Sequence, residues 1–466
     1  MLSSREYRRS ISIGLVVTSL TLITFVYVGS STNNYYTVLQ NFQFSRGKNL
    51  SDPSSVRVLC LILTSPKYIH TRAKAVHETW APQCDRHFFI TEYFGNNITS
   101  KQINVTEQIP IAPIKNITAG YDHLTQKSTL AFLFAYENYL NDFDWFVKAD
   151  DDTYVIVEHL KTFLNEQNPS EPVTFGYNFK IHVPKGYHSG GASYVLSRES
   201  LQRFYEAHKD PTSNCRKDGG SEDVEIANCL RTKGVYPGKS LDKQNRELFH
   251  PLSFTDHFRG LFPDWLETYA ENPPQNNYNC CSDQTISFHY VRPEEQYLMY
   301  FLLYKTRSTS HIDPKLIKTS HSSMIPVIVP QGYHSGGASY VLSRESLRRF
   351  YEAHKDPTSN CRKDEGSEDV EIANCLRTKG VYPGKSLDKE NRELFHPLSF
   401  TDHFRGYFPD WLLKYAENSL RTHYDCCSDE TISFHYVSPE EQYLMNFLLY
   451  RAHPTSNIIK SNSSST

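Results

Sequence analysis

Three adjacent carboxylates, Asp150, Asp151 and Asp152, closely follow an apolar run at residues 145–148. The run is typical of a buried strand, and neighbouring acids repel one another unless a cation lies among them. Carboxylate oxygens are suitable ligands for Mg²⁺ or Mn²⁺, and open α/β sheets bind ligands beyond the carboxyl ends of their strands. The stretch therefore predicts a strand that carries acids to a metal-bound ligand. A solvated acidic turn before the next helix is the alternative, and these residues alone leave it open.

A second group of acids lies in the sequence Gly219-Gly-Ser-Glu-Asp-Val-Glu225, at the start of a helix predicted at residues 224–231. Ser221 suits an N-cap and acids suit the first helical turn, which explains these residues without any chemistry. Alternatively, Asp223 is a general base that takes a proton from a substrate hydroxyl. Upstream, Gly190 and Gly191 would let the backbone approach a ligand closely, or would form a turn before a strand at 194–196.

One histidine and one cysteine pair are further candidates. A neutral imidazole such as that of His250 is a common ligand for metals such as Mn²⁺, although a single histidine is more often structural. The segment 280–290 begins with the adjacent residues Cys280 and Cys281 and ends in a predicted strand at 285–290. We expect the two cysteines to pair with separate partners rather than with each other, but the spacing leaves the connectivity open.

The bulk composition limits the class of protein. The chain has 466 residues, a formal net charge of −3 and ten cysteines. This length accommodates two or three domains, and the small net charge gives no indication of a nucleic-acid partner. Ten cysteines, including two adjacent pairs, favour an oxidising compartment.

The N-terminus carries Arg5, Arg8 and Arg9 before an uncharged, largely apolar run of 18 residues at 11–28. This length is near the lower limit for a helix that spans a bilayer, and the preceding charges predict that the N-terminus stays cytosolic. We expect an uncleaved signal anchor rather than a cleaved signal peptide, with residues 1–10 cytosolic, 29–55 as a stem and the rest lumenal. Asn-x-Ser/Thr sequons fit that placement; they start at Asn49, Asn97, Asn104, Asn116 and Asn462.

Strands and helices alternate after the stem, which predicts a doubly wound α/β sheet. The nearly continuous apolar run at 56–64 is typical of a strand that is buried on both faces of a parallel sheet. Further strands are predicted at 87–91, 145–148 and 174–177, and helices at 68–80, 124–140, 157–165 and 198–208.

Residues 186–304, which we call the first copy, recur as residues 332–450, the second block, at a constant offset of 146. Only 15 of the 119 aligned positions differ, so this is a block duplication, with a period far too long for a solenoid. The second block follows a linker at 305–331, precedes a polar tail at 451–466 and lacks the triple aspartate, so we expect it to be non-catalytic. It could be a passenger domain, could exchange with the first copy by domain swapping, or could result from a fused gene model.

Together these motifs resemble the core 1 β1,3-galactosyltransferases, within the β1,3-glycosyltransferase family that also includes the Fringe enzymes. The resemblance covers about residues 56–304 and rests on a series of segments in order. They are Leu59-Cys-Leu to Thr64, Ala75 to Trp80 with Cys84, Asp144-Trp-Phe-Val-Lys-Ala-Asp-Asp-Asp-Thr-Tyr-Val-Ile156, Gly190-Gly-Ala-Ser-Tyr-Val-Leu-Ser197, Glu222-Asp223, Phe249-His-Pro251, and Cys280-Cys-Ser-Asp to Ser287-Phe-His-Tyr-Val291.

The resemblance implies a GT-A glycosyltransferase fold in residues 56–304 of a type II Golgi membrane enzyme. Such an enzyme would transfer galactose from UDP-galactose to O3 of N-acetylgalactosamine on Ser or Thr of glycoprotein acceptors, with inversion, and it leaves a homodimer open. The implied Mn²⁺ ligands are Asp150, Asp152 and His250, and the implied base is Asp223. The implied nucleotide-binding residues are Thr64, Arg72, Lys148, Asp150 and Asp151, and the implied substrate-binding residues are Gly190, Gly191, Glu222 and Trp265.

Some positions depart from the family pattern. Ser193 stands where the family usually has glycine, Gln126 replaces a tryptophan, and the aromatic acceptor segment is reduced to Trp265, Tyr269 and Tyr278. These departures concern the acceptor more than the donor chemistry. The alternatives are a β1,3-glycosyltransferase with another donor or acceptor, and a non-catalytic, chaperone-like lumenal relative. The intact set of acids favours an enzyme.

Overall fold

The computed structural model describes residues 56–92, 109–306, 329, 332–359, 361–452 and 454. The predicted cytosolic tail, signal anchor and stem, nearly all of the linker and most of the C-terminal tail lie outside these residues, as do Asn49, Asn97, Asn104 and Asn462. The sequon residue Asn116 is described and exposed. Within the described ranges, none of the helices combines the length and the apolar character needed to cross a membrane.

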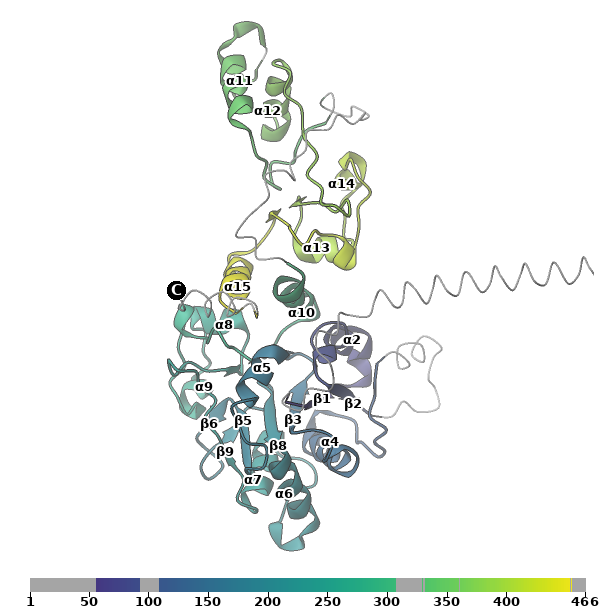
Figure 1. Ribbon diagram of the computed structural model, residues 1–466, viewed down its shortest axis with the longest axis vertical. Helices are drawn as coiled ribbons and strands as arrows, with labels where there is room; N and C mark the ends of the chain where they lie inside the picture. The colour runs from purple at the N-terminus through teal and green to yellow at the C-terminus, as the bar shows by residue number, and fades with distance from the viewer. Residues whose placement is uncertain are drawn as a thin grey trace, which may run out of the picture. The chain divides into compact units, whose positions relative to one another are not determined.

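A six-stranded mixed sheet forms the centre of the fold (Figure 1). Its strands are β1 (Val58–Leu63), β2 (Arg86–Ile90), β3 (Trp145–Asp150), β5 (Val173–Gly176), β8 (Tyr194–Ser197) and β9 (Tyr236–Pro237). The order is β2-β1-β3-β8-β5-β9, in which β1 is parallel to β2 and β3, whereas β8 is antiparallel to β3 and β5. The predicted α/β class is confirmed, and the sheet is mixed because β8 runs against both of its neighbours.

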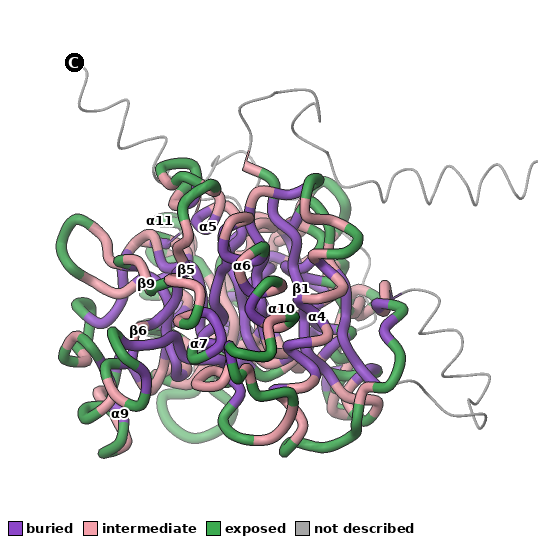
Figure 2. The backbone as a smooth tube through the Cα atoms, turned by 90° about the horizontal axis from the view of Figure 1, so that it is seen from below, coloured by how far each residue is buried: buried purple, intermediate pink, exposed green. Residues whose placement is uncertain are grey.

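Helices cover both faces of this sheet. One face carries α4 (Leu124–Tyr139), α6 (Arg198–Lys209) and α7 (Glu222–Arg231), and the other carries α2 (Lys74–Glu78), α5 (Val157–Leu164) and α10 (Pro293–Tyr300). Strand β1 is buried throughout, and its alternate residues enter the two cores, with Leu59 and Leu61 on the α4 side and Cys60 and Ile62 on the other. The central strands are correspondingly buried in Figure 2. Coverage on both faces explains the continuous apolar run in the sequence.

A small three-stranded sheet brings distant segments to the acids. It consists of β4 (Tyr154–Val155), β10 (Phe249–His250) and β11 (Ser287–Phe288), in the order β10-β11-β4. In the antiparallel pair β11 and β4, Phe288 lies opposite Tyr154. The residues that follow β11 therefore reach the acids that precede β4. The strand predicted at 285–290 is present, but it extends only over Ser287–Phe288.

The other elements between residues 56 and 306 are short. The helix predicted at 68–80 is divided into the 3₁₀ helix η1 (Pro66–Tyr68), the π-helix η2 (Ile69–Ala73) and α2. The remaining elements are η3 (Ala81–Gln83), η4 (Tyr121–His123), β6 (Asn178–Phe179), β7 (Tyr187–His188), η5 (Pro211–Ser213), α8 (Phe254–Arg259), α9 (Asp264–Tyr269), η6 (Asn277–Asn279) and η7 (Phe301–Lys305).

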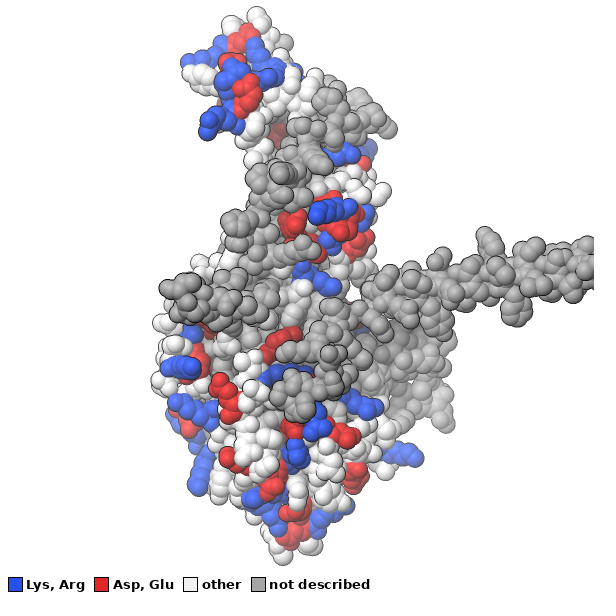
Figure 3. Space-filling model, in the orientation of Figure 1, with Lys and Arg blue, Asp and Glu red and all other residues white. Residues whose placement is uncertain are grey.

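The second block keeps its helices but not the strand of the large sheet. Its elements are α11 (Arg344–Lys355), η9 (Pro357–Ser359), α12 (Glu368–Arg377), β12 (Phe395–His396), α13 (Phe400–Arg405), α14 (Asp410–Tyr415), η10 (His423–Asp425), β13 (Ser433–Phe434) and α15 (Pro439–Tyr450). Val341 is 68% exposed, whereas its counterpart Val195 in β8 is fully buried. Over α11, acidic and basic side chains lie side by side, and Arg348 pairs with Glu345 (Figure 3).

All ten cysteines form disulfides. Cys60 pairs with Cys84, Cys215 with Cys229, and Cys361 with Cys375. The expectation of separate partners for the adjacent cysteines is wrong, because Cys280 bonds to Cys281 and Cys426 to Cys427. Every other cysteine is already paired within its own neighbourhood, so no separate partner remains for the adjacent ones.

We predict that Ser193→Gly stabilises the protein. Ser193 has φ of 66°, a left-handed conformation that favours glycine, and its buried hydroxyl finds no hydrogen-bond partner among the described residues. Relief of this conformation is expected to raise the free energy of unfolding by about 1 kcal/mol, measured by urea denaturation of the full chain. The matched control is Ser339→Gly, at φ of 63° in the second block, where the hydroxyl donates to Ser433 and its loss offsets the gain. An unchanged or lower stability of Ser193→Gly would contradict the argument.

Candidate active site

The loop that carries the triple aspartate is fixed by hydrogen bonds from three distant segments. Trp80 Nε1 donates to the carbonyl oxygen of Thr153 at 3.0 Å, and Gln296 Nε2 donates to that of Asp151 at 3.2 Å. The backbone N–H of Val291 donates to the carbonyl oxygen of Asp152 at 2.8 Å. The carboxylates are thus held at the carboxyl end of β3, as the sequence predicts, and the loop is not a freely solvated turn.

Two of the predicted nucleotide-binding residues contact these acids. Thr64 Oγ1 donates to Asp151 at 2.7 Å, and Arg72 Nη1 lies 2.8 Å from Asp152 and 3.4 Å from Asp151. Burial raises the pKa of Asp151 to about 7. Burial also acts to raise the pKa of Asp152, but hydrogen bonding to His289 and the charge of Arg72 outweigh it, so that this pKa is lowered. Asp152 is therefore the more strongly anionic of the pair.

Asp150, Asp152 and His289 lie close enough together to hold a metal ion. One ligand atom from each lies within 4.8 Å of the other two, and His289 Nε2 is 3.3 Å from Asp152 Oδ1. Two carboxylates and one imidazole are a donor set that suits a divalent cation such as Mn²⁺. The residues present therefore fit the metal that the sequence implies.

His250 does not belong to this cluster, so the predicted metal set changes. Its side chain is fully buried, with Nε2 3.3 Å from Thr285 Oγ1 and the ring stacked on Phe288 at 4.7 Å. Burial lowers the pKa of His250 well below its usual value. His250 ends β10, whereas His289 follows the neighbouring strand β11. Only the pairing of β11 with β4 places His289 beside the acids. In the sequence, the only indication of this role is the position of His289 near the end of the predicted strand at 285–290.

Lys148 connects the acids to the other half of the site. Its buried Nζ lies 2.8 Å from Asp150 Oδ1 and 3.5 Å from Glu222 Oε2, and it donates to the carbonyl oxygen of Gly190 at 3.2 Å. Burial alone would lower the pKa of this lysine, but the carboxylates of Asp150 and Glu222 reverse the effect and raise it. Lys148 is thus a fixed cation between β3, the glycine turn and α7.

Asp223 has the environment of a general base. The backbone N–H of Gly190 donates to its Oδ2 at 3.1 Å, and that of Val224 donates to its Oδ1 at 2.9 Å. Burial raises the pKa of Asp223 to about 6, and the neighbouring Glu222 carboxylate adds to the rise. Ser221 is the N-cap residue of α7, but its side chain makes no capping hydrogen bond. The acids therefore begin a helix, as their position alone explains, and the raised pKa of Asp223 is also compatible with proton transfer.

The two adjacent glycines allow the site to close around them. A Cβ at Gly190 would meet Glu222 Oε2 at 2.7 Å, and one at Gly191 would meet the His289 ring at 2.0 Å. Neither site tolerates a side chain unless the neighbour moves. One dipeptide thus bonds to the candidate base Asp223 and abuts the candidate metal ligand His289.

Aromatic side chains extend from this centre to the surface. Trp265 is 39% exposed and lies edge-on to Phe179, which contacts Tyr187. Burial, and then the charge of Asp223, raises the pKa of Tyr187, so Tyr187 lies close enough to feel the charge of Asp223. Tyr290, which sequence reasoning did not single out, is 55% exposed and stacks on His289 at 3.8 Å. Exposed rings of this kind offer faces on which a sugar can stack.

A cluster of acids that could hold a metal, a fixed buried cation and a carboxylate of raised pKa together suit an enzyme active site. The comparisons with known proteins make the class of enzyme specific. The chain belongs to the Fringe-like family, which matches residues 54–327. It is a glycosyltransferase of the β1,3-galactosyltransferase type.

Named relatives support this family. The chain is 36% identical over 276 residues to glycoprotein-N-acetylgalactosamine 3-beta-galactosyltransferase 1 of Xenopus laevis, a match that spans 58% of this chain and 73% of that relative. It is 26% identical to human chondroitin sulfate synthase 3 and 25% identical to mouse beta-1,3-glucosyltransferase. Those two matches cover 37% and 46% of this chain, but only 20% and 44% of the relatives.

We predict that Gly191→Ala weakens divalent-metal binding by at least about tenfold, because the added methyl group displaces His289 from the cluster. The matched control is Gly337→Ala in the second block, where a Cβ would meet His435 at 2.2 Å without a triple aspartate nearby. Calorimetric titration of Mn²⁺ into each full-chain variant measures the effect, with thermal unfolding to verify the fold. Wild-type affinity in a folded Gly191→Ala protein would contradict the role of His289.

Proposed function

We propose that the chain transfers galactose from UDP-galactose to O3 of N-acetylgalactosamine on Ser or Thr of glycoproteins, with inversion at the anomeric carbon. The observation that carries the proposal is the arrangement around two adjacent glycines. Gly190 bonds to Asp223, and Gly191 abuts His289 of the acid cluster. A base and a metal-bound donor would thereby meet at one short segment, as a direct displacement requires. The printed name of the Xenopus laevis relative supports the donor sugar and the acceptor.

The chain's own residues would have the following roles. Asp150, Asp152 and His289 would hold Mn²⁺, which when bound offsets charge on the diphosphate leaving group. The cations Arg72 and Lys148 pair with different acids, Asp152 and Asp150, and would bind the donor together with Thr64 and Asp151. In its deprotonated form, Asp223 would accept the proton of the attacking O3 hydroxyl. Glu222 and Trp265 would position the acceptor, with a single displacement and one base giving inversion.

The catalytic unit would be residues 56–304, with a GT-A fold, and the second block would not be catalytic on its own. Among the described residues, the acid cluster that could hold a metal ion belongs to the N-terminal half and the first copy. We further propose a type II Golgi membrane protein that is anchored by residues 11–28. The paired cysteines and the exposed sequon at Asn116 are compatible with a lumenal domain.

We predict that galactose transfer increases with pH through about pH 6. The pKa of Asp223 is raised to about 6, so below that pH the carboxyl group is protonated and cannot act as a base. Asp223→Asn should lower kcat by at least about a hundredfold without a matching loss of UDP affinity. Asp369→Asn, the counterpart in the second block that makes the same 3.1 Å bond to a glycine N–H, is the control and should retain activity. Equal losses of kcat in both variants would contradict the role of Asp223 as the base.

The decisive assay measures transfer from UDP-galactose to a GalNAcα-Ser/Thr peptide, with Mn²⁺ present and then chelated. We expect Mn²⁺-dependent product that is abolished by Asp152→Ala and by His289→Ala, while His435→Ala in the second block stays active. Product absent from a folded, UDP-binding protein would indicate a different acceptor. Absence of both product and UDP binding would indicate a non-catalytic relative and overturn the proposal.

A further inference from the structure

The C-terminal helix of each copy packs on the other copy. Phe447 of α15 stacks on Phe254 of α8, with ring centroids 4.9 Å apart and the planes 29° from parallel. Phe301, which precedes it by 146 positions, stacks on Phe400 of α13 at 4.8 Å and 30°. The second contact is therefore the first one with the two copies interchanged. Figure 1 shows α15 next to α8 and α10 next to α13.

The other contacts between the copies repeat in the same reciprocal way. Each contact has a counterpart in which one residue number is lower by 146 and the other is higher by 146. The ring contact of Tyr443 with Phe258 at 4.4 Å corresponds to that of Tyr297 with Phe404 at 4.5 Å, and the contact of Phe447 with Phe288 at 6.2 Å corresponds to that of Phe301 with Phe434 at 6.4 Å. The ion pair of Glu440 with Arg259 likewise corresponds to that of Glu294 with Arg405. An interface in which residue i meets j and j meets i has two-fold symmetry, and such isologous interfaces usually join two separate subunits.

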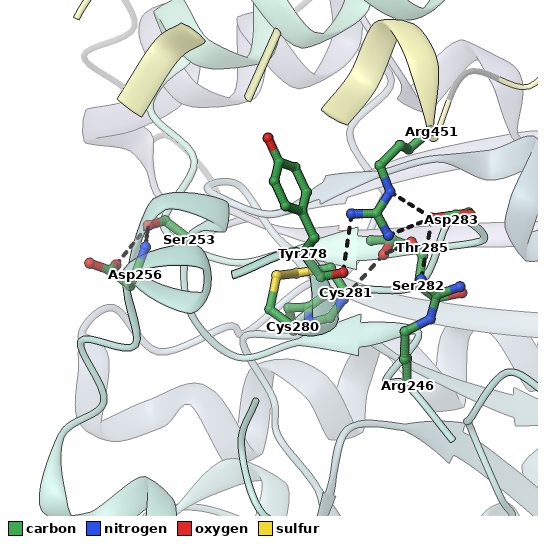
Figure 4. Close-up of a disulfide and its surroundings, with 11 residues drawn as sticks. Arg246, Ser253, Asp256, Tyr278, Cys280, Cys281, Ser282, Asp283, Thr285 and Arg451 are labelled. Carbon is green, nitrogen blue, oxygen red and sulfur yellow. Dashed lines mark hydrogen bonds and ion pairs between the residues drawn. A yellow bond between two sulfur atoms is a disulfide. The ribbon is translucent and has the colours of Figure 1, made fainter. Parts of the chain in front are cut away.

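One polar contact strengthens the half of the interface that lies on the first copy. Arg451, at the end of α15, lies 2.7 Å from Asp283 and donates to the carbonyl oxygen of Tyr278 at 3.1 Å (Figure 4). Its guanidinium also lies over the Tyr278 ring, 5.3 Å from the centroid. In the reciprocal position, Lys305 lies 5.8 Å from the Tyr424 ring. The symmetry therefore persists where the residue types of the two copies differ.

The second block also supports the strand that immediately precedes the candidate metal ligand. Phe447 and Leu448 are almost fully buried and belong to the same hydrophobic core as Phe254 and Phe288. Phe288 ends β11 and immediately precedes His289. A passenger domain would not contribute side chains to this core, so the passenger interpretation does not fit the structure.

We propose that the second block acts as a second subunit built into the same chain. It covers, with α15, the surface of α8 and β11 through which two separate copies would pair. In the described part of the chain, this surface is then covered in both copies, and the chain is a monomer that contains its two-fold axis internally. The homodimer left open by the sequence would thus be replaced by an intramolecular pair.

Native mass spectrometry of the full chain tests the stoichiometry. We expect the wild-type protein to have the mass of one chain, whereas a two-chain mass would show that the copies pair between chains and would overturn the proposal. Phe400→Asp combined with Phe447→Asp places a carboxylate in both halves of the interface but leaves the first copy unchanged. This variant should form a two-chain species through its freed first copies. A one-chain mass would show that the surface does not accept a second copy.

Hydrogen exchange tests the contact within the chain and does not depend on activity. Peptides 254–261 and 400–407 differ only at Leu261 and Tyr407, so mass spectrometry distinguishes the two copies. Phe447→Asp alone should accelerate exchange in peptide 254–261 by at least about tenfold and affect peptide 400–407 less. Tyr450→Ala, on the same helix but 64% exposed, is the control and should change neither peptide. Unchanged exchange in peptide 254–261 of Phe447→Asp would overturn the proposed packing.

Discussion

The buried cation Lys148 is the interaction on which the arrangement of the site depends. It carries charge from the centre of β3 to the junction of two acidic segments and the glycine turn, and it bonds to Asp150, Glu222 and the Gly190 carbonyl group. Removing one member of such a buried ion pair typically costs about 3–5 kcal/mol, because the remaining charges lose their compensation. Without Lys148, α7 would present its acids to an uncompensated acid loop. The same lysine therefore keeps the metal side and the base side of the site together.

Sequence reasoning succeeded where local pattern and site chemistry coincide. The apolar run before the triple aspartate identifies β3, and the position of acids after a strand predicts that they gather beyond its carboxyl end, where Asp150 and Asp152 meet His289. It did not single out His289, because His250 ends one two-residue strand and His289 immediately follows another, and their local sequences do not distinguish them. Only strand order does so, since β11 pairs with β4 and β10 does not. Long-range pairing of such short strands leaves almost no trace in periodicity.

The duplication separates local from tertiary determinants within one chain. Helices α6 and α11 have the same bounds after the offset. In each, the N-cap serine accepts a hydrogen bond from the backbone N–H of the residue three positions further along. The preceding segment Ala-Ser-Tyr-Val-Leu-Ser is identical in both copies, yet it forms β8 at 194–197 and no strand at 340–343. In the first copy β3 and β5 supply its hydrogen bonds, and the second block has no equivalent strands. Strand formation therefore depends on neighbours that helix formation does not need.

This difference also determines how the second block can be stable. The helix face that α4 covers in the first copy is uncovered in the second, where Leu347 is 57% exposed although its counterpart Leu201 is fully buried. The second block therefore lacks one of the two cores that surround the sheet. Several of its buried residues, among them Phe400, Cys427 and Leu448, join the core of the first copy. Because apolar burial supplies most of the free energy of folding, this block gains its largest stabilisation from the reciprocal helix contacts. The interface between the copies is thus part of the fold of the second block as well as a cover for the first.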